Sequence, residues 1–275
     1  MAGMLTFVGL GLYDERSITV AGREAVRGAD RVVAEFYTSE LAGVSLADLE
    51  RFHGVDIEVR DRDGVEGSPD DFLADAESGD VVFLTAGDTM VSTTHVDLRL
   101  RAHERGIETR VVHGTTARTA ASSLTGLQNY RFGKATTLPF ERSHGGDGVP
   151  ASVLETIAAN RERGLHTLVF LDIDAAGDAY MRADAAAEML ATTLDESDDE
   201  TVVDATSGDS TLGVAVARAG SPSSVVRADA LSTLAGESFG DPLHLLVIPG
   251  ELHHVERDAL AELGGAPERV LPDLR

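Results

Sequence analysis

The sequence contains no cysteine and no tryptophan, and Lys134 is its only lysine among 275 residues. Without cysteine there is no disulfide framework, no thiolate nucleophile and no cysteine-based metal site. No uninterrupted apolar run approaches the ~18 residues that a membrane-spanning helix needs. The N-terminus also lacks the basic and apolar regions of a signal peptide. We therefore expect a cytoplasmic protein with no membrane partner.

Basic residues are scarce throughout the chain. Lys and Arg together number 23 against 47 Asp and Glu, which gives a formal net charge of -24 and a pI near 4.6. This balance disfavours direct nucleic-acid binding, because the basic patch that displaces phosphate counterions is missing. The same charge is tolerable in molar salt, where the Debye length falls to ~3 Å. The composition thus indicates a halophile's protein, and an acidic protein that binds a cationic partner is the alternative.

The common catalytic motifs are also missing. There is no phosphate-binding GxxxxGK[ST] and no zinc-binding HExxH, and Ser210 in GDSTL lacks the second glycine of a GxSxG elbow. Gly9-Leu10-Gly11 follows a predicted strand and Glu35 could accept a ribose hydroxyl, but Asp14 replaces the third glycine of the dinucleotide fingerprint. An NAD-dependent oxidoreductase remains an alternative on this motif alone.

Nine histidines raise the question of a metal. They include His95, His113, His166, His244 and the adjacent pair at 253–254, scattered without a ligand spacing. We expect structural or surface roles and no metal site, with His244 as the ring that could reach a ligand at the mouth of a strand. The residues alone identify no acid, base or nucleophile, which favours chemistry carried by a cofactor.

The chain is organised around residues 80–95, DVVFLTAGDTMVSTTH. Its apolar run at 81–84 is typical of a strand that is buried on both faces of a parallel sheet. Gly87 and Asp88 predict a tight turn, and hydroxyls at 92–94 predict the cap of a helix that ends at Gly106. Ligands bind at the carboxyl ends of strands in open α/β sheets, so this loop is a candidate binding site. The alternative is an ordinary surface turn.

Strands and helices alternate along the first part of the chain, which predicts a parallel sheet with helices on its faces. We expect strands at 4–10, 31–36, 57–59, 80–84 and 109–113, and helices at 18–28 and 46–52. A third helix begins with a Ser68 cap and Pro69 and ends at 78, and a fourth follows the hydroxyls at 92–94 and runs through 105. The later part predicts helices at 117–124, 150–163, 182–194 and 255–263, with strands at 135–138, 167–172, 212–217, 224–227 and 243–249. The fold class is α/β, and we place a domain boundary near Thr115, giving domains 1–115 and 116–275.

Eight segments, taken together and in order, carry a family resemblance. They are FVGLGLYDERSIT at 7–19, AEFYTS at 34–39, FLTAGDTMVSTTH at 83–95, YRFGKATT at 130–137, GLHTLVFLDI at 164–173, ARAGS at 217–221, FGDPLHLLVIPGELH at 239–253 and GAPERVL at 265–271. These segments resemble the diphthine synthases, the methyltransferases of diphthamide biosynthesis. The resemblance covers nearly the whole chain. It implies a two-domain fold of the tetrapyrrole-methylase type, each domain a sheet flanked by helices, with S-adenosyl-L-methionine in the cleft between the domains, and a homodimer.

The resemblance also implies a set of cofactor contacts at strand ends and loops. They are Leu12, Asp88, Val91, Thr116, Ala117, Leu171, Ala219 and His244. The family usually has proline where Ala86 and Thr89 stand, and a different sequence at HGTT, 113–116. The acidic stretch 195–211 does not match the family and reads as a surface insertion.

The implied reaction is successive methylation of the amino group of a 3-amino-3-carboxypropyl-histidine on elongation factor 2, which gives diphthine. An amine is mostly protonated at neutral pH, so protons must leave during the reaction. The sequence names no base; water, a cleft carboxylate or the substrate's own carboxylate would suffice. The alternatives are a tetrapyrrole-precursor methyltransferase of the same superfamily and a non-catalytic cofactor-binding protein.

Overall fold

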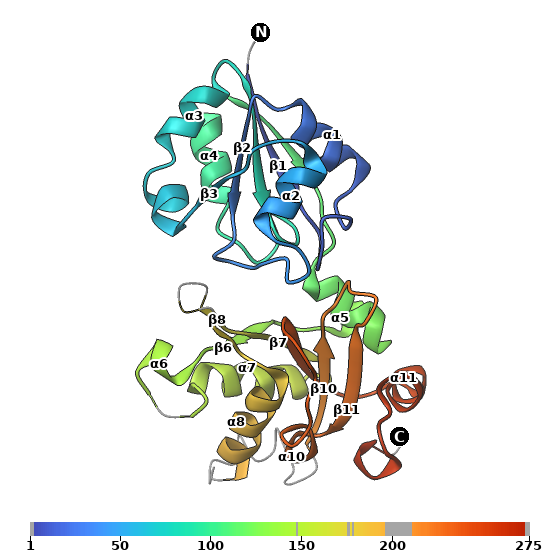
Figure 1. The fold of residues 1–275 in the computed structure, drawn as a ribbon. Coiled ribbons are helices and arrows are strands. Elements are labelled where there is room, and N and C mark those ends of the chain that lie inside the picture. The colour runs from blue at the N-terminus through green and yellow to red at the C-terminus, as the bar shows by residue number, and fades with distance from the viewer. Residues whose placement is uncertain (1–2, 147, 175–176, 178, 196–210, 273–275) are drawn as a thin grey trace. The chain divides into compact units, whose positions relative to one another are not determined.

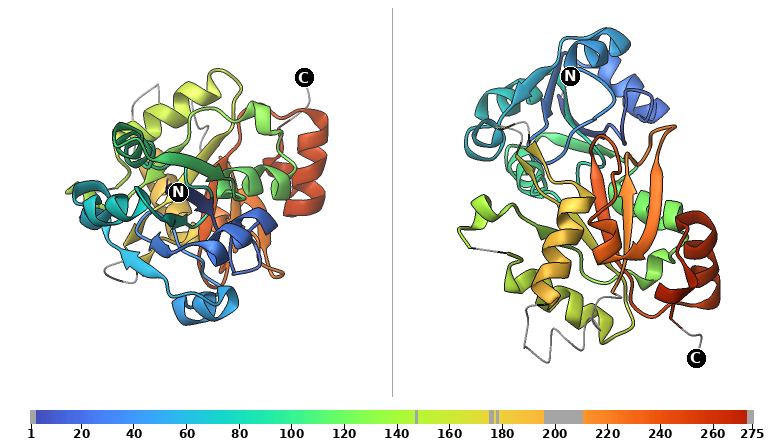
Figure 2. Two further views of the ribbon diagram at one scale, coloured as in Figure 1. Left: turned by 90° about the horizontal axis from the view of Figure 1, so that it is seen from above. Right: turned by 60° about the horizontal axis from the view of Figure 1, so that its bottom comes forward.

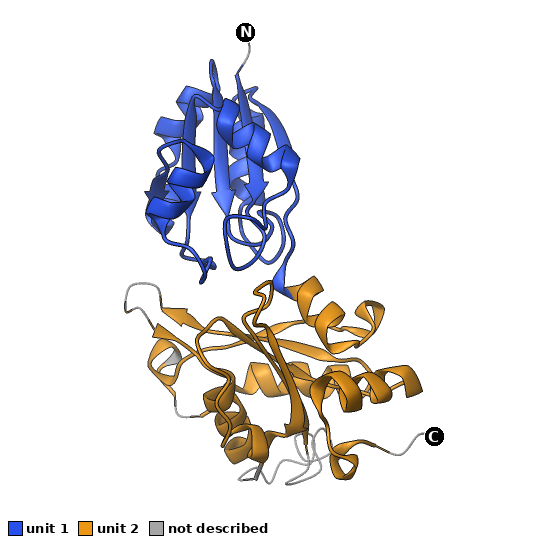
Figure 3. Cartoon of the chain, turned by 45° about the vertical axis from the view of Figure 1, so that its right-hand side comes forward, with its two compact units in different colours: residues 1–117 blue, residues 118–275 orange. Residues whose placement is uncertain are grey.

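The computed structural model describes residues 3–146, 148–174, 177, 179–195 and 211–272. Ser210 and most of the acidic stretch 195–211 therefore lie outside the described residues. The chain divides into two compact units, residues 1–117 and 118–275 (Figure 3). Within the described ranges, no helix combines the length and the apolar content needed to cross a bilayer.

The first unit is built on a five-stranded sheet in the order β3-β2-β4-β1-β5. Its strands are β1 (Met4–Gly9), β2 (Arg31–Glu35), β3 (Glu58–Arg60), β4 (Asp80–Thr85) and β5 (Glu108–Val112). All of their pairings are parallel, as the alternation of strands and helices predicts. The carboxyl ends of β1, β4 and β5 therefore lie at one edge, with β1 in the middle.

Helices cover both faces of this sheet (Figure 1). Helices α1 (Val20–Gly28) and α2 (Leu46–His53) lie on one face, and α3 (Asp70–Ala76), α4 (Val96–Glu104) and the short π-helical turn η1 (Asp63–Gly67) lie on the other. Phe7 and Phe83 are buried against the α3 and α4 side, whereas Val8 and Leu84 are buried against the α1 and α2 side. Because both faces are covered, the central strands are continuous apolar runs.

Two of the expected helix caps are wrong. Helix α3 follows Pro69 and helix α4 follows His95, and neither residue makes a side-chain cap bond. Ser68 instead ends η1, where its N–H donates to the Asp63 carbonyl. The Thr93 hydroxyl donates to the Thr89 carbonyl within its own loop, and the Thr94 hydroxyl donates to the Glu66 carboxylate of η1. Neither hydroxyl is therefore bonded to the start of the helix.

The second unit contains a mixed sheet in the order β11-β10-β12-β7-β6. Its strands are β6 (Thr136–Leu138), β7 (Thr167–Leu171), β10 (Leu212–Ala217), β11 (Val225–Ala230) and β12 (His244–Ile248), and a short hairpin joins β8 (Ile173–Asp174) to β9 (Ala179–Tyr180). Only the β6–β7 pair within this sheet is parallel. β12 thus runs antiparallel to both of its neighbours.

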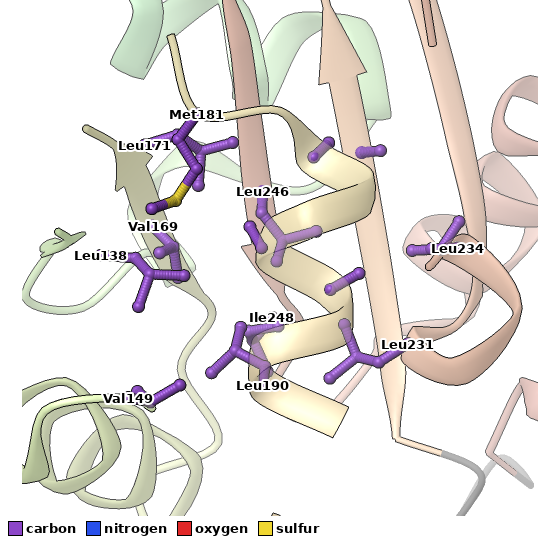
Figure 4. Packing of buried hydrophobic residues seen from close by; sticks show 14 of the residues in the cluster. Leu138, Val149, Val169, Leu171, Met181, Leu190, Leu231, Leu234, Leu246 and Ile248 are labelled. Atoms are coloured by element: carbon purple, nitrogen blue, oxygen red, sulfur yellow. The ribbon is translucent and has the colours of Figure 1, made fainter. Parts of the chain in front are cut away.

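Helices pack around this second sheet (Figures 1 and 2). They are α5 (Ala117–Thr125), α6 (Glu141–His144), α7 (Ala151–Arg161), α8 (Ala183–Asp195), α10 (Leu231–Leu234) and α11 (His254–Gly264), with 3-10 turns η2 (Asn129–Arg131) and η4 (Glu268–Val270). Figure 4 shows the core, where Leu190 of α8 and Leu231 of α10 lie near the β12 side chains Leu246 and Ile248. Burying each such leucine or isoleucine side chain from water stabilises the fold by roughly 1.5–3 kcal/mol.

A buried carboxylate and a buried histidine ring are hydrogen-bonded to each other within this second unit. The Glu256 carboxylate in α11 accepts the backbone N–H groups of Gln128 and His253, both at 2.8 Å, and lies 3.0 Å from His166 Nε2. His166 Nδ1 accepts the Gly250 N–H at 3.0 Å, so the proton on Nε2 is directed at Glu256. Burial would raise the pKa of Glu256, but these hydrogen bonds lower it below its usual value. These bonds link α11 to the segment after α5, to the residue before β7 and to the turn after β12.

Candidate functional site

Three loops meet at the carboxyl edge of the first sheet, and glycine makes the meeting possible. Gly11 and Gly87 exchange backbone hydrogen bonds of 3.1 and 2.7 Å across the loops that follow β1 and β4. A Cβ on Gly114, in the loop after β5, would lie 2.1 Å from the Gly87 carbonyl oxygen. Gly87 also has φ +75, a conformation that side-chain-bearing residues rarely adopt. The three loops are therefore in direct backbone contact.

Asp88 fixes this junction. It is 4% exposed, and its Oδ1 accepts the Met90 N–H at 2.9 Å, which is the local turn that the sequence predicts. Its Oδ2 accepts the Gly114 N–H at 3.1 Å and lies 2.8 Å from Nδ1 of His113. One buried carboxylate thus orders its own loop and holds the loop after β5 in place.

A buried histidine and a buried carboxylate also lie close together beneath the same loop. His95 Nδ1 donates to the Thr89 carbonyl at 3.1 Å, and His95 Nε2 lies 3.5 Å from Oε1 of Glu35 at the end of β2. Both side chains are at most 1% exposed, and burial lowers the pKa of the His95 imidazole. The other Glu35 oxygen accepts the N–H groups of Tyr37 and Thr38. Glu35 is unavailable to a ribose hydroxyl, so the nicotinamide interpretation of this residue is wrong.

The remaining predicted contacts of the first unit surround this junction. Leu12 follows β1, and its carbonyl accepts the Asp14 N–H and the Ser17 hydroxyl. Val91 lies in the Asp88 loop and is 39% exposed. Thr116 follows the His113 loop, and Ala117 begins α5. The structure thus places Leu12, Asp88, Val91 and Thr116 on the loops that follow β1, β4 and β5, and Ala117 at the first position of α5.

The predicted contacts of the second unit gather at one end of its own sheet. His244 begins β12 and pairs with Ala217 at the end of β10, and its neighbour Leu245 pairs with Phe170 of β7. Leu171 ends β7, and Ala219 follows β10, so both lie at the end where β12 begins. The Leu171 side chain is buried in the core, so a ligand would meet its backbone.

Both ring nitrogens of His244 are already engaged. Nδ1 accepts the Ala183 N–H at 3.1 Å, and Nε2 donates to the Asp241 carbonyl at 2.9 Å. The side chain is buried, and this burial lowers the pKa of His244, which favours the neutral ring that these two bonds require. The ring therefore orders the turn before β12, and a ligand contact at this residue would come from its backbone.

The sequence did not reveal two features of this site. His113 is one of nine histidines without a ligand spacing, and no motif in the sequence predicts that its ring contacts the buried Asp88 carboxylate. The sequence also gives no reason to join His95 to Glu35. A signal was available for the first pair, because Asp88 and His113 each follow a predicted strand, and parallel strands bring such residues to one edge.

Comparison with known proteins identifies the family. Residues 4–235 match the family model described as Tetrapyrrole (Corrin/Porphyrin) Methylases. The diphthine synthase of Natronomonas pharaonis is 65% identical, over 98% of this chain and 99% of that protein. The diphthine synthase of Haloquadratum walsbyi is 63% identical, over 98% of each chain. A crystal structure of diphthine synthase is 38% identical, with a TM-score of 0.85, over 97% of this chain and 98% of that one.

These likenesses, together with the two-unit α/β fold, define a tetrapyrrole-methylase-type methyltransferase that uses S-adenosyl-L-methionine. Within that class the chain belongs to the diphthine synthase family, whose reaction is a step of diphthamide biosynthesis. The haloarchaeal relatives also agree with the halophilic composition. The nicotinamide oxidoreductase and the non-catalytic binding protein are therefore set aside.

Proposed function

We propose that the chain methylates, in successive steps, the amino group of a 3-amino-3-carboxypropyl-histidine on elongation factor 2. The product of three transfers is the trimethylammonium group of diphthine. The observation that carries this proposal is the sequence identity of 63–65% to diphthine synthases over 98% of the chain. When bound, S-adenosyl-L-methionine supplies an electrophilic methyl group on a sulfonium. The residues of this chain then have to bind the cofactor, orient the amine and exclude water.

The first-unit edge suits a cationic cofactor. Its central charged group is the Asp88 carboxylate, which is nearly buried and fixed by two backbone N–H groups. A carboxylate in such surroundings interacts more strongly with a sulfonium than it would in open water. Leu12, Val91 and Ala117 carry apolar side chains, which would contact the uncharged parts of the cofactor. These residues fit the group, and we propose them as its contacts, together with Thr116.

The second-unit edge completes the proposed set with Leu171, Ala219 and His244. Its loops are held firmly: the Arg218 guanidinium donates to the carbonyls of Phe239, Asp241 and Ser223. That the cofactor lies between the two domains, 1–115 and 116–275, stays a prediction.

Backbone strain supports these assignments. In the described ranges, the non-glycine residues with positive φ are Tyr13 at +72, Ser92 at +59 and Arg218 at +49. Each lies directly beside a proposed contact: Leu12, Val91 and Ala219, in that order. Such conformations cost of order 1–3 kcal/mol and concentrate where a loop must present its backbone to a ligand.

We also propose that the enzyme is a cytoplasmic homodimer whose protein substrate is elongation factor 2. The resemblance to the family supports the dimer, and light scattering in molar potassium chloride would measure it directly. A monomeric mass would contradict it.

Mass spectrometry of the product tests the proposed reaction. Elongation factor 2 that carries the aminocarboxypropyl group is incubated with the enzyme and S-adenosyl-L-methionine in molar salt, and the modified peptide is followed over time. We expect species with one, two and finally three added methyl groups. If the factor gains no methyl while a corrinoid or porphyrinoid precursor does, the tetrapyrrole alternative is correct instead.

A further inference from the structure

One histidine at the first-unit edge has an orientation suited to proton transfer. The His113 side chain is 78% exposed, but its Nδ1 lies 2.8 Å from the buried Oδ2 of Asp88. A carboxylate has no proton to donate, so Nδ1 carries the shared proton and Nε2 presents a lone pair. Among the described residues, no hydrogen-bond partner contacts Nε2. The ring is therefore fixed at one nitrogen and open at the other.

We propose that His113 is the general base of the reaction, accepting at Nε2 a proton from the substrate ammonium; this inference rests on the proposed function. In the first step the ammonium N–H bond breaks and Nε2 gains the proton. The nitrogen lone pair then forms a bond to the sulfonium methyl carbon, and the carbon–sulfur bond breaks with its electron pair on sulfur. His113 releases its proton to solvent. The second step repeats this exchange, and the third begins once the dimethylated ammonium has lost its proton.

Asp88 positions the ring for proton transfer. Its carboxylate holds the ring in one orientation, and its hydrogen bond keeps the proton on Nδ1 so that Nε2 faces outward. Asp88 is itself held by the Met90 and Gly114 N–H groups. Asp88 is also the charged group that the structure places against the ring.

The other described histidine side chains are less suitable. His244 and His166 use both ring nitrogens in hydrogen bonds, and His53 and His95 are at most 2% exposed. The exposed rings lie on other elements, at 103 in α4 and at 253–254 at the start of α11. His113 alone among these combines an exposed nitrogen with a carboxylate on the other and a position beside the proposed cofactor loop.

His113→Asn is the informative variant, because the asparagine amide keeps a donor for Asp88 and removes Nε2. At neutral pH we expect kcat for methyl transfer to fall by about 10²-fold or more, with the cofactor Kd changed less than about twofold. The defect should shrink as pH rises, because a growing share of the substrate amine is already neutral and needs no acceptor. His103→Gln, in the exposed last turn of α4, is the matched control and should behave as wild type.

The outcomes separate this inference from the function on which it rests. If the wild type transfers no methyl to elongation factor 2, both proposals fail. If the wild type is active and His113→Asn retains full activity, or loses the same factor at every pH, the ring is not the base. Added imidazole should partly restore His113→Ala, and a lack of rescue together with a flat pH profile would also contradict the proposal.

Discussion

Asparagine at position 88 should weaken cofactor binding by a predictable amount. Asp88→Asn keeps the shape of the side chain, but its amide must place an NH2 where an oxygen now accepts a hydrogen bond. If the NH2 replaces Oδ1, it faces the Met90 N–H; if it replaces Oδ2, it faces the Gly114 N–H and His113. In either orientation at least one part-buried backbone donor loses its acceptor and meets another donor.

An unsatisfied buried donor costs about 1–3 kcal/mol. If the loop must hold its observed conformation to bind the cofactor, that free energy is lost from binding. A cost of this size corresponds to a Kd raised by about 5- to 160-fold. The variant also removes a negative charge, so S-adenosyl-L-methionine should lose more affinity than its neutral product, S-adenosylhomocysteine.

Isothermal titration calorimetry of both ligands in molar potassium chloride measures these changes. Asp97→Asn is the control, because this exposed α4 side chain pairs with Arg101 on the same helix. We expect the control to bind both ligands as wild type does. Wild-type affinity of Asp88→Asn for both ligands would refute the assignment of this loop to the cofactor site. Equal losses for the two ligands would show that Asp88 acts through loop geometry alone.

Three further predictions concern stability. His53→Leu should raise the free energy of unfolding by about 1 kcal/mol in urea titrations, because neither buried ring nitrogen has a partner among the described residues. Burial, with Arg23 and Arg27 nearby, lowers the pKa of His53 below its ordinary 6.5, so below pH 6.5 the ring is protonated in the unfolded chain before it is protonated in the native state. The gain in stability from His53→Leu should therefore grow as pH falls below 6.5. A difference in stability that is constant with pH would contradict this. Glu256→Gln should lower the free energy of unfolding by about 1–3 kcal/mol, because in either orientation its NH2 faces an N–H donor of Gln128, His166 or His253. An unchanged urea midpoint would show that the hydrogen bonds of Glu256 contribute little to stability. Finally, Tm should rise from about 0.1 M to about 2 M potassium chloride as salt screens the net charge of -24, and calorimetric scans with a constant Tm would argue against self-repulsion.

The fold was largely predictable because its elements are strongly patterned. The apolar runs that become β1, β4 and β12 are buried on both sides, and such runs have few alternatives to a central strand. The short elements were missed, including η1, α6, α10 and the β8–β9 hairpin, because two to five residues carry too little periodicity to be read. The Ser68 cap failed because Ser68 ends the π-helical turn η1, and the 92–94 cap failed because the Thr93 and Thr94 hydroxyls bond to the preceding loop and to Glu66.

The site was predictable only as separate loops. Gly87 and Asp88 predict a turn from their own chemistry, and the structure shows that turn. The contact between Asp88 and His113 depends on the sheet order β4-β1-β5, which no local pattern contains. The same holds for Gly114, which must be glycine because the Gly87 carbonyl approaches it from another loop. Site residues could be placed on loops, but their pairing required the topology.

Transfer of labelled methyl from S-adenosyl-L-methionine to elongation factor 2 that bears the aminocarboxypropyl-histidine tests the central claim most directly. The assay is run in molar potassium chloride with the wild type and with Asp88→Ala, whose fold is checked by circular dichroism. We predict label on the factor with the wild type, and its loss or strong reduction with the variant. No label on the factor from a wild-type enzyme that binds the cofactor would contradict the proposed substrate, and full labelling by Asp88→Ala would contradict the proposed site.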